Sequence, residues 1–134
     1  MNALEEGTRL QLDFEKLRAV GRGSRSVVPV VLQNADSGEV LFVGYADATA
    51  LQETLSSGTA VLWSTSRDEL WRKGASSGDV LDLVEVRVNC EQNSLLYRVR
   101  PRAGACHTLA ANGESRPSCY YRKLSSKAEL VFVE

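Results

Sequence analysis

The chain has 134 residues, of which 43% are hydrophobic and 25% are charged, and this balance is typical of one globular domain rather than a disordered chain. Sixteen basic side chains face seventeen acidic ones, which disfavours nucleic acid and anionic membranes as partners. Apolar runs are far too short to span a bilayer, and residues 1–6 are acidic, unlike a secretory signal. We therefore expect a single domain over residues 1–134, located in the cytoplasm.

The N-terminal part of the chain predicts a helix followed by a β-hairpin. Residues 11–20 repeat apolar side chains with a helix-like period. Two β-branched runs, 27–33 and 40–45, flank the turn-forming residues 34–38, which indicates two antiparallel strands. Pro29 cannot donate a backbone hydrogen bond, so we expect it at an edge position or at the strand start.

A capped helix and a third strand are expected next. Asp47 can cap a helix that runs through Leu55, and Gly58 lies just beyond its end. Residues 59–63 predict a strand. Residues 64–78 are rich in Ser, Gly, Arg and Lys and are interpreted as a polar segment, interrupted by Leu70 and Trp71.

The C-terminal half predicts mainly strands. Residues 80–88 alternate apolar and polar side chains and pair naturally with residues 94–99 across a short turn. A loop at 111–117 separates them from short candidate strands at 120–122 and 130–133. The whole pattern favours an α+β fold that is mostly β, with mixed or antiparallel sheets and one or two helices.

The segment from Trp63 to Gly78, WSTSRDELWRKGASSG, holds more functional residue types than packing requires. Its backbone N–H groups, hydroxyls and cationic side chains could bind phosphate, and its two tryptophans could stack on a base. The alternative is a solvated loop whose tryptophans fill the core. The candidate substrate-binding residues are Trp63, Ser64, Ser66, Arg67, Trp71, Lys73, Gly74, Ser76, Ser77 and Gly78.

Three cysteines and a lone histidine form a second group of candidates: Cys90, Cys106, Cys119 and His107. The odd count argues against a disulfide framework, which leaves core thiols, a metal site or a reactive centre. Adjacent side chains on an extended segment point apart, so Cys106 and His107 are not expected to bind one metal together. Three thiolates on zinc would leave one position for water, with His107 as the proton carrier. The alternative for His107 is a surface or hydrogen-bonded core histidine.

These motifs together resemble the phosphoribosyl-AMP cyclohydrolase family, over about residues 28–122. The segments that support the resemblance are QNADSGEVLFVGY (33–45), WSTSR (63–67), LWRKGASSG (70–78), VNC (88–90), GACHT (104–108) and SCYYR (118–122).

The resemblance implies an intertwined homodimer that binds zinc and magnesium. Zinc would be held by Cys106 and Cys119 together with Cys90 from the opposite subunit, and His107 would act as a general base. The 63–78 segment would face a phosphorylated purine nucleotide. The implied reaction is zinc-dependent hydrolytic opening of the adenine C6–N1 bond of N1-(5-phosphoribosyl)-AMP, a step of histidine biosynthesis.

The chain departs from the family pattern at the magnesium motif, which is Asp-Cys-Asp-x-Asp. Here Asn89, Glu91 and Asn93 occupy the acidic positions, so we expect weak magnesium binding with Glu91 as the one charged ligand. Thr65 also replaces an arginine of the WSTSR segment. Two alternatives stay open: a paralogue that hydrolyses another purine-like nucleotide, and a non-catalytic, zinc-stabilised dimer that binds nucleotides. A nucleobase deaminase is disfavoured because the H-x-E and P-C-x-x-C motifs are absent.

Overall fold

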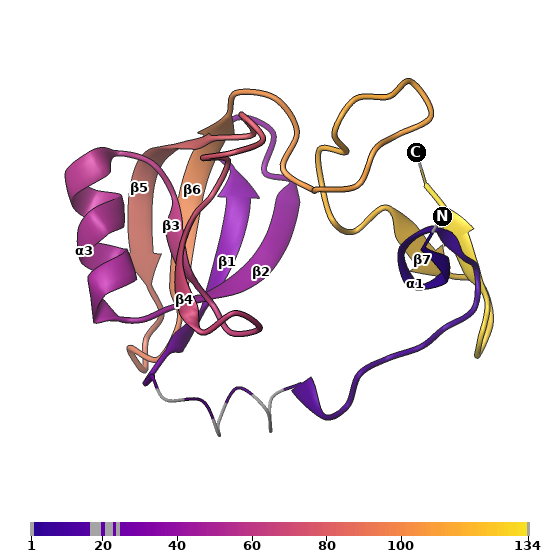
Figure 1. Ribbon diagram of the computed structural model, residues 1–134, viewed down its shortest axis with the longest axis horizontal. Helices are drawn as coiled ribbons and strands as arrows, with labels where there is room; N and C mark the ends of the chain where they lie inside the picture. Colours follow the sequence, from indigo (N-terminus) through magenta and orange to yellow (C-terminus); the bar gives the residue numbers. More distant parts are fainter. Residues whose placement is uncertain (1, 17–19, 21–22, 24, 134) are drawn as a thin grey trace.

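A four-stranded mixed sheet forms the centre of the computed structural model, which describes residues 2–16, 20, 23 and 25–133 (Figure 1). The strand order is β2-β1-β6-β5, with β1 parallel to β6 and the other neighbours antiparallel. The predicted class, mostly β with mixed sheets and helices, is confirmed. These strands are β1 (Val28–Asn34), β2 (Val40–Ala46), β5 (Leu81–Val88) and β6 (Leu95–Pro101).

Both predicted hairpins are confirmed, β1 with β2 and β5 with β6. Pro29 is the second residue of β1 and lies opposite Tyr45 of β2. Pairing between β1 and β6 begins one residue later, at Val30 and Leu95. Pro29 therefore marks the strand start, where its missing N–H interrupts no hydrogen bond to β6.

The predicted capped helix is α3 (Ala48–Ser57), which ends two residues beyond Leu55. The Asp47 carboxylate accepts a hydrogen bond from the Ala50 N–H at 2.7 Å, as an N-cap does. Gly58 closes the helix with φ of 71°, in the left-handed region where glycine has no steric penalty.

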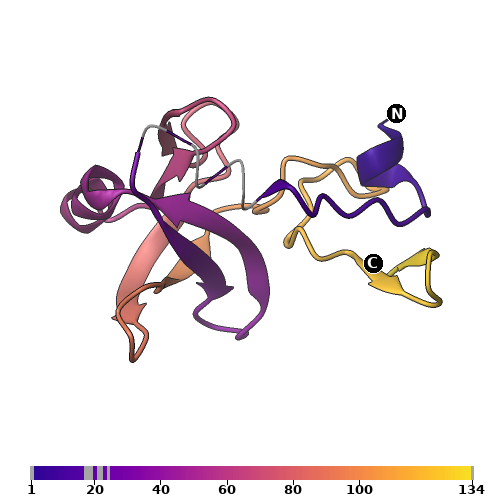
Figure 2. The same ribbon diagram turned by 90° about the horizontal axis from the view of Figure 1, so that it is seen from below.

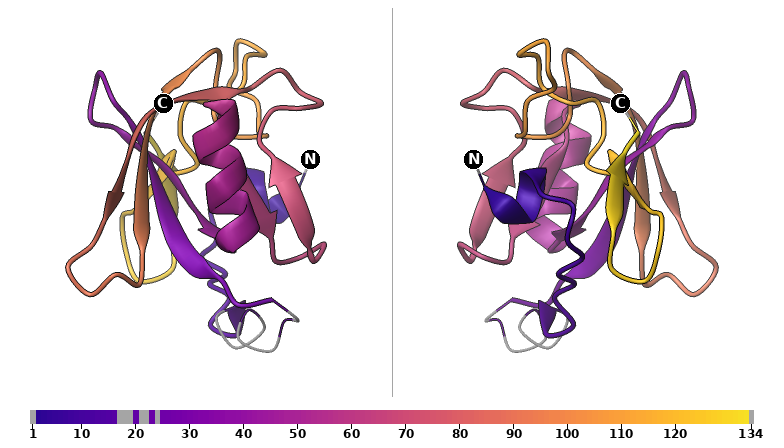
Figure 3. Two further views of the ribbon diagram at one scale, coloured as in Figure 1. Left: turned by 90° about the vertical axis from the view of Figure 1, so that its left-hand side faces the viewer. Right: turned by 90° about the vertical axis from the view of Figure 1, so that its right-hand side faces the viewer.

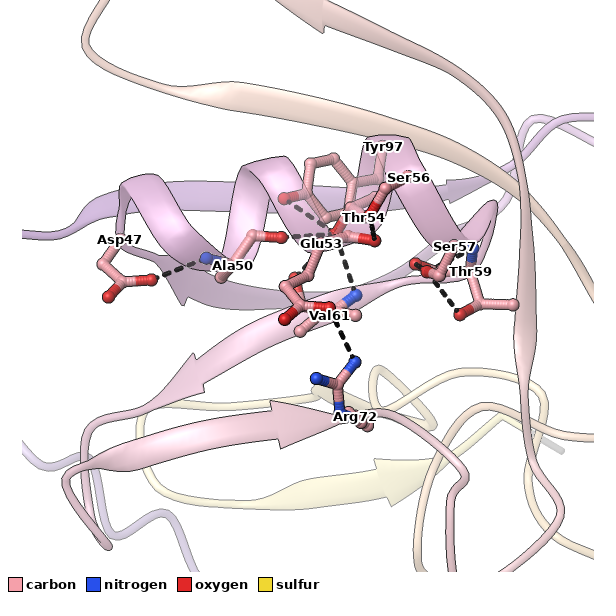
Figure 4. Close-up of polar contacts among 10 residues, drawn as sticks. All are labelled: Asp47, Ala50, Glu53, Thr54, Ser56, Ser57, Thr59, Val61, Arg72 and Tyr97. Carbon is pink, nitrogen blue, oxygen red and sulfur yellow. Dashed lines mark hydrogen bonds and ion pairs between the residues drawn. The ribbon is translucent and has the colours of Figure 1, made fainter.

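Hydrogen bonds of the Thr54 side chain link α3 to neighbouring strands (Figure 4). Its fully buried hydroxyl accepts the Val61 N–H at 2.9 Å and donates to the Ala50 carbonyl at 2.9 Å. The Tyr97 hydroxyl of β6 lies 3.4 Å from the same oxygen. One side chain thus joins α3 to β3 (Val61–Ser64) and to the central sheet.

The segment predicted to be polar contains a strand, β4 (Glu69–Arg72), which pairs antiparallel with β3. The pairing sets Trp71 opposite Leu62, and both Leu70 and Trp71 pack against the core. Figure 3 shows α3 between the four-stranded sheet and this hairpin. Sheet, helix and hairpin together enclose a core that includes Val30, Leu32, Leu41, Leu62, Leu81, Tyr97 and Val99.

Both chain ends meet in a second lobe, visible beside the sheet in Figures 1 and 2. The lobe contains α1 (Ala3–Glu6), β7 (Arg122–Leu124) and β8 (Leu130–Phe132), the last two close to the predicted strands. Backbone hydrogen bonds join Leu130 N to Thr8 O at 2.7 Å and Leu10 N to Ala128 O at 2.8 Å. The N-terminal segment is therefore an integral part of this lobe.

A buried arginine anchors that segment. Arg116 is 4% exposed and binds the Glu6 carboxylate through both guanidinium nitrogens, at 2.7 and 3.2 Å. Its guanidinium also lies 3.9 Å from the ring centre of Tyr121. These hydrogen bonds hold the pKa of Glu6 below its ordinary value.

The helix predicted over residues 11–20 falls partly on residues 17–19, which lie outside the described residues. Residues 11–13 have no regular secondary structure, and Phe14 is 88% exposed. In the part of the chain that the structure describes, no helix has the length and apolar character needed to cross a membrane.

Candidate active site

A cavity of about 500 Å³ lies where the two lobes meet. One wall comes from β4 and the loop after it, and the other comes from the segment that carries the sequence ACHT and from Cys119. Cys119 N donates to the Leu41 carbonyl at 2.8 Å, which ties this wall to β2. The lining residues are Phe42, Arg67, Glu69, Leu70, Trp71, Arg72, Lys73, Gly74, Ala75, Ser76, Ser77, Asp79, Ala105, His107 and Cys119.

Lys73 places a buried ammonium on the cavity wall. The residue is 7% exposed, and its Nζ donates to the Asp79 carbonyl at 3.0 Å. Burial lowers the pKa of this amine. An ammonium carries three N–H donors and the bond to Asp79 uses one, so Lys73 can also donate to an anionic ligand.

The loop after Lys73 needs glycine for its tight path. Gly74 has φ of +83°, and a Cβ there would lie 2.4 Å from the Asp79 carbonyl carbon. The Gly78 N–H closes the loop by donating to the Gly74 carbonyl at 2.9 Å. This fold brings the hydroxyl-bearing Ser76 and Ser77 to the cavity beside Lys73.

Cys119 lines this cavity, and Cys106 lies in sequence between two other lining residues, Ala105 and His107. Cys106 is buried and Cys119 is exposed, and a hydrogen bond between the two sulfurs lowers the pKa of Cys106 to about 5 while it raises the pKa of Cys119. The Thr108 hydroxyl lies 3.0 Å from the Cys106 sulfur and further favours its thiolate. The pair therefore offers one thiolate and one thiol to an electrophile or a soft metal ion.

His107 is exposed and borders the cavity, whereas the neighbouring Cys106 side chain is buried. The His107 Nε2 binds the Glu5 carboxylate, which reaches it from α1. The Tyr121 hydroxyl donates to the Glu5 carbonyl at 2.7 Å and holds that residue in place. An N-terminal residue thus orients the single histidine of the chain.

Cys90 does not join the other two cysteines within one chain. It is exposed on the turn between β5 and β6, away from residues 104–119 in Figures 1 and 2. Among the described residues, no three His, Cys, Asp or Glu side chains are grouped closely enough to hold a metal ion. Asn89, Glu91 and Asn93, the predicted magnesium positions, lie in the same turn as Cys90.

Of the ten candidate substrate-binding residues, six line the cavity: Arg67, Trp71, Lys73, Gly74, Ser76 and Ser77. Trp63, Ser64, Ser66 and Gly78 are not among the lining residues. Trp63 is 8% exposed, and the Arg25 guanidinium lies 4.7 Å from its ring centre. The Ser64 hydroxyl accepts the Arg67 N–H at 3.2 Å and so shapes the turn that presents Arg67.

Sequence reasoning missed three residues of the site: two line the cavity, and one contacts His107. Phe42 packs against Trp71 with ring centres 6.0 Å apart, which orients that indole. The Asp79 backbone carbonyl accepts a hydrogen bond from the Lys73 ammonium, and the Asp79 carboxylate accepts one from the Ser115 hydroxyl at 2.8 Å. Its place directly after the candidate segment 63–78 was the available signal. Glu5 had no signal, because it lies about a hundred residues from its partner His107.

The chain is similar in sequence to known proteins over most of its length. The family model for phosphoribosyl-AMP cyclohydrolase matches residues 42–121. A protein named phosphoribosyl-AMP cyclohydrolase from Sphingopyxis alaskensis is 42% identical over 107 residues, covering 80% of each chain. One of the same name from Haloquadratum walsbyi is 44% identical over 101 residues, covering 75% of this chain and 72% of the relative.

A longer relative also matches: the histidine biosynthesis bifunctional protein HisIE of Thermus thermophilus. It is 42% identical over 118 residues, which cover 87% of this chain and 52% of the relative. The family match spans more than half of the chain. It includes the loop at residues 73–78, Cys106 and Cys119. The chain belongs to the phosphoribosyl-AMP cyclohydrolase family.

Proposed function

We propose that this chain hydrolyses the C6–N1 bond of the adenine ring in N1-(5-phosphoribosyl)-AMP, as a zinc-dependent homodimer in histidine biosynthesis. The observation that supports it best is the composition of the cavity. A buried ammonium, an arginine, serine hydroxyls and an indole share one cavity with His107 and Cys119. Groups suited to a phosphorylated purine thus face groups suited to hydrolysis.

Substrate binding follows from the charges and ring surfaces of the cavity. Lys73, Arg67 and the Ser76 and Ser77 hydroxyls would bind a phosphate, since charge-assisted hydrogen bonds are the strong ones. Trp71, held by Phe42, offers an aromatic surface to the purine. The substrate carries two phosphate ends, and these residues account for one of them.

The reaction needs only water as a co-reactant. Substitution at N1 makes the adenine ring electron-poor at C6. The oxygen of water bonds to C6, the C6–N1 bond breaks with its electron pair going to N1, and both hydrogens of water stay in the product. His107 would accept a proton from the attacking water, because histidine is the side chain that exchanges protons near neutral pH. Glu5 would keep its imidazole oriented.

The donor set of the cavity fits zinc. Cys106 and Cys119 lie close enough for their sulfurs to hydrogen-bond to each other, and soft thiolates are preferred zinc ligands. When bound, zinc supplies a Lewis acid that makes water easier to deprotonate. We propose Cys90 of a second subunit as the third ligand, because Cys90 is exposed on its turn and no third Cys, His, Asp or Glu joins Cys106 and Cys119 among the described residues of one chain.

The test is turnover of N1-(5-phosphoribosyl)-AMP by the purified, zinc-loaded protein. We expect a product heavier than the substrate by one water, and loss of turnover when zinc is stripped. N1-methyl-AMP serves as a second substrate. Turnover of that compound alone would support a paralogue with another purine-like substrate, and turnover of neither would support a non-catalytic nucleotide-binding dimer.

A further inference from the structure

The turn between β5 and β6 is closed by a hydrogen bond between two asparagine side chains. Asn89 Nδ2 donates to Asn93 Oδ1 at 2.7 Å. Asn89 Oδ1 accepts the backbone N–H groups of Asn93 and Ser94, both at 2.9 Å. Asn93 Nδ2 donates to Glu91 Oε2 at 3.3 Å. We call Asn89 and Asn93 the amide clasp; Cys90 lies between its two members.

This arrangement does not fit magnesium. A carbonyl oxygen has two lone pairs, and those of Asn89 Oδ1 are used by two backbone N–H groups. Asn93 Oδ1 is engaged by an amide N–H, and a second amide N–H faces Glu91. A cation at this turn would meet N–H donors where it needs oxygen lone pairs, and one carboxylate is a poor substitute for the anionic oxygens that Mg²⁺ prefers.

The amide clasp closes the turn without a metal ion, whereas two carboxylates in the same places would need a cation to close it. Two carboxylates as close as these amide groups would repel each other and would need a cation between them. An amide pair is neutral and joins directly, so it closes the turn by itself. Two backbone hydrogen bonds also close the turn. The Asn89 N–H donates to the Ser94 carbonyl at 3.3 Å, and the Gln92 N–H donates to the Asn89 carbonyl at 3.0 Å.

We propose that the amide clasp replaces a divalent cation at this turn, so that the chain presents Cys90 without magnesium. Asn89 and Asn93 are then positioning residues for Cys90. This positioning role rests on the proposed zinc site, whereas the absence of a magnesium site does not depend on any reaction.

The experiment measures Mn²⁺ binding by electron paramagnetic resonance and Mg²⁺ binding by calorimetry, on the zinc-loaded protein without substrate. We expect no saturable site in the unaltered chain at millimolar metal. The Asn89→Asp, Asn93→Asp double variant should gain one site per chain. Asn34→Asp is the matched control. Asn34 Oδ1 also accepts two backbone N–H groups in a turn, but Asn34 is not part of the amide clasp. It should gain no site.

The positioning role has its own readout. The double variant should lose zinc content when magnesium is withheld and recover it when magnesium is added, whereas the unaltered chain should keep its zinc in both cases. If the double variant does not fold, Asn93→Asp alone serves, since it sets a second carboxylate beside Glu91.

Two results would overturn the inference. One saturable Mn²⁺ ion per unaltered chain, lost in Glu91→Gln, would show that the turn is a metal site. Absence of binding in every variant would show that the amides are not what excludes the cation. Since no substrate is present, a failure of the proposed reaction would leave these outcomes unchanged.

Discussion

Replacing Lys73 with methionine removes the buried charge from the cavity while it keeps a side chain of similar length. Lys73 is 7% exposed, so a phosphate bound to it would meet an ammonium with little water to compete. A hydrogen bond to a charged group contributes about 1.5–3 kcal/mol. The affinity for substrate should therefore fall by roughly 10- to 150-fold.

The loss should appear in KM rather than in kcat. A phosphate end lies away from the reacting C6 atom, so its contact is the same in the ground state and the transition state. Steady-state kinetics on N1-(5-phosphoribosyl)-AMP gives both constants. Lys123→Met on β7 is the control, because Lys123 is exposed and outside the cavity lining. A KM within twofold of the unaltered protein would refute the reasoning and leave Lys73 as a clamp for the Asp79 carbonyl.

Thr54, Arg116 and His107 make separate contacts, and the loss of each has a measurable result. Thr54→Val should lower the free energy of unfolding by about 1–3 kcal/mol, because it removes the acceptor of the buried Val61 N–H. Urea denaturation measures this change, and an unchanged midpoint urea concentration would contradict it. Arg116 lowers the pKa of Glu6 from 4.5, so their pairing should stabilise the second lobe above that pH, and this stability should be lost as pH falls through the folded-state pKa. Hydrogen-exchange protection factors over residues 3–9, corrected for the intrinsic rate at each pH, should therefore fall in acid; protection factors that do not change with pH would contradict this. His107→Ala should lower kcat by roughly 10²- to 10⁴-fold with zinc content unchanged; full turnover would remove the histidine from the mechanism.

Local signals in the sequence were enough to predict α3 and both hairpins. Asp47 and Gly58 act as helix caps through their own chemistry, and the β-branched runs on either side of residues 34–38 have one plausible pairing. Strand β4 was missed because Leu70 and Trp71 are flanked by charged residues, and its partner strand β3 supplies the burial that the segment lacks alone.

The short strands of the second lobe were indicated by the sequence, but its assembly could not be predicted, because its contacts join the two ends of the chain. Glu6 and Arg116 are 110 residues apart, and nothing in an acidic N-terminus indicates a buried arginine partner. The cavity was partly predictable, since six candidate residues of the 63–78 segment and His107, identified by type, line it. Trp63 was expected to be available to a base, yet burial under Arg25 keeps it outside the lining.

The central claim is that zinc is held by Cys106 and Cys119 of one subunit and Cys90 of another, and subunit mixing tests it most directly. Cys90→Ser and Cys106→Ser should each abolish turnover when purified alone. In a mixed dimer, one site would combine the intact Cys106 and Cys119 of the first variant with the intact Cys90 of the second. Random exchange should therefore restore about one quarter of the unaltered activity. A mixture that stays inactive, although mass spectrometry shows mixed dimers, would contradict a shared site.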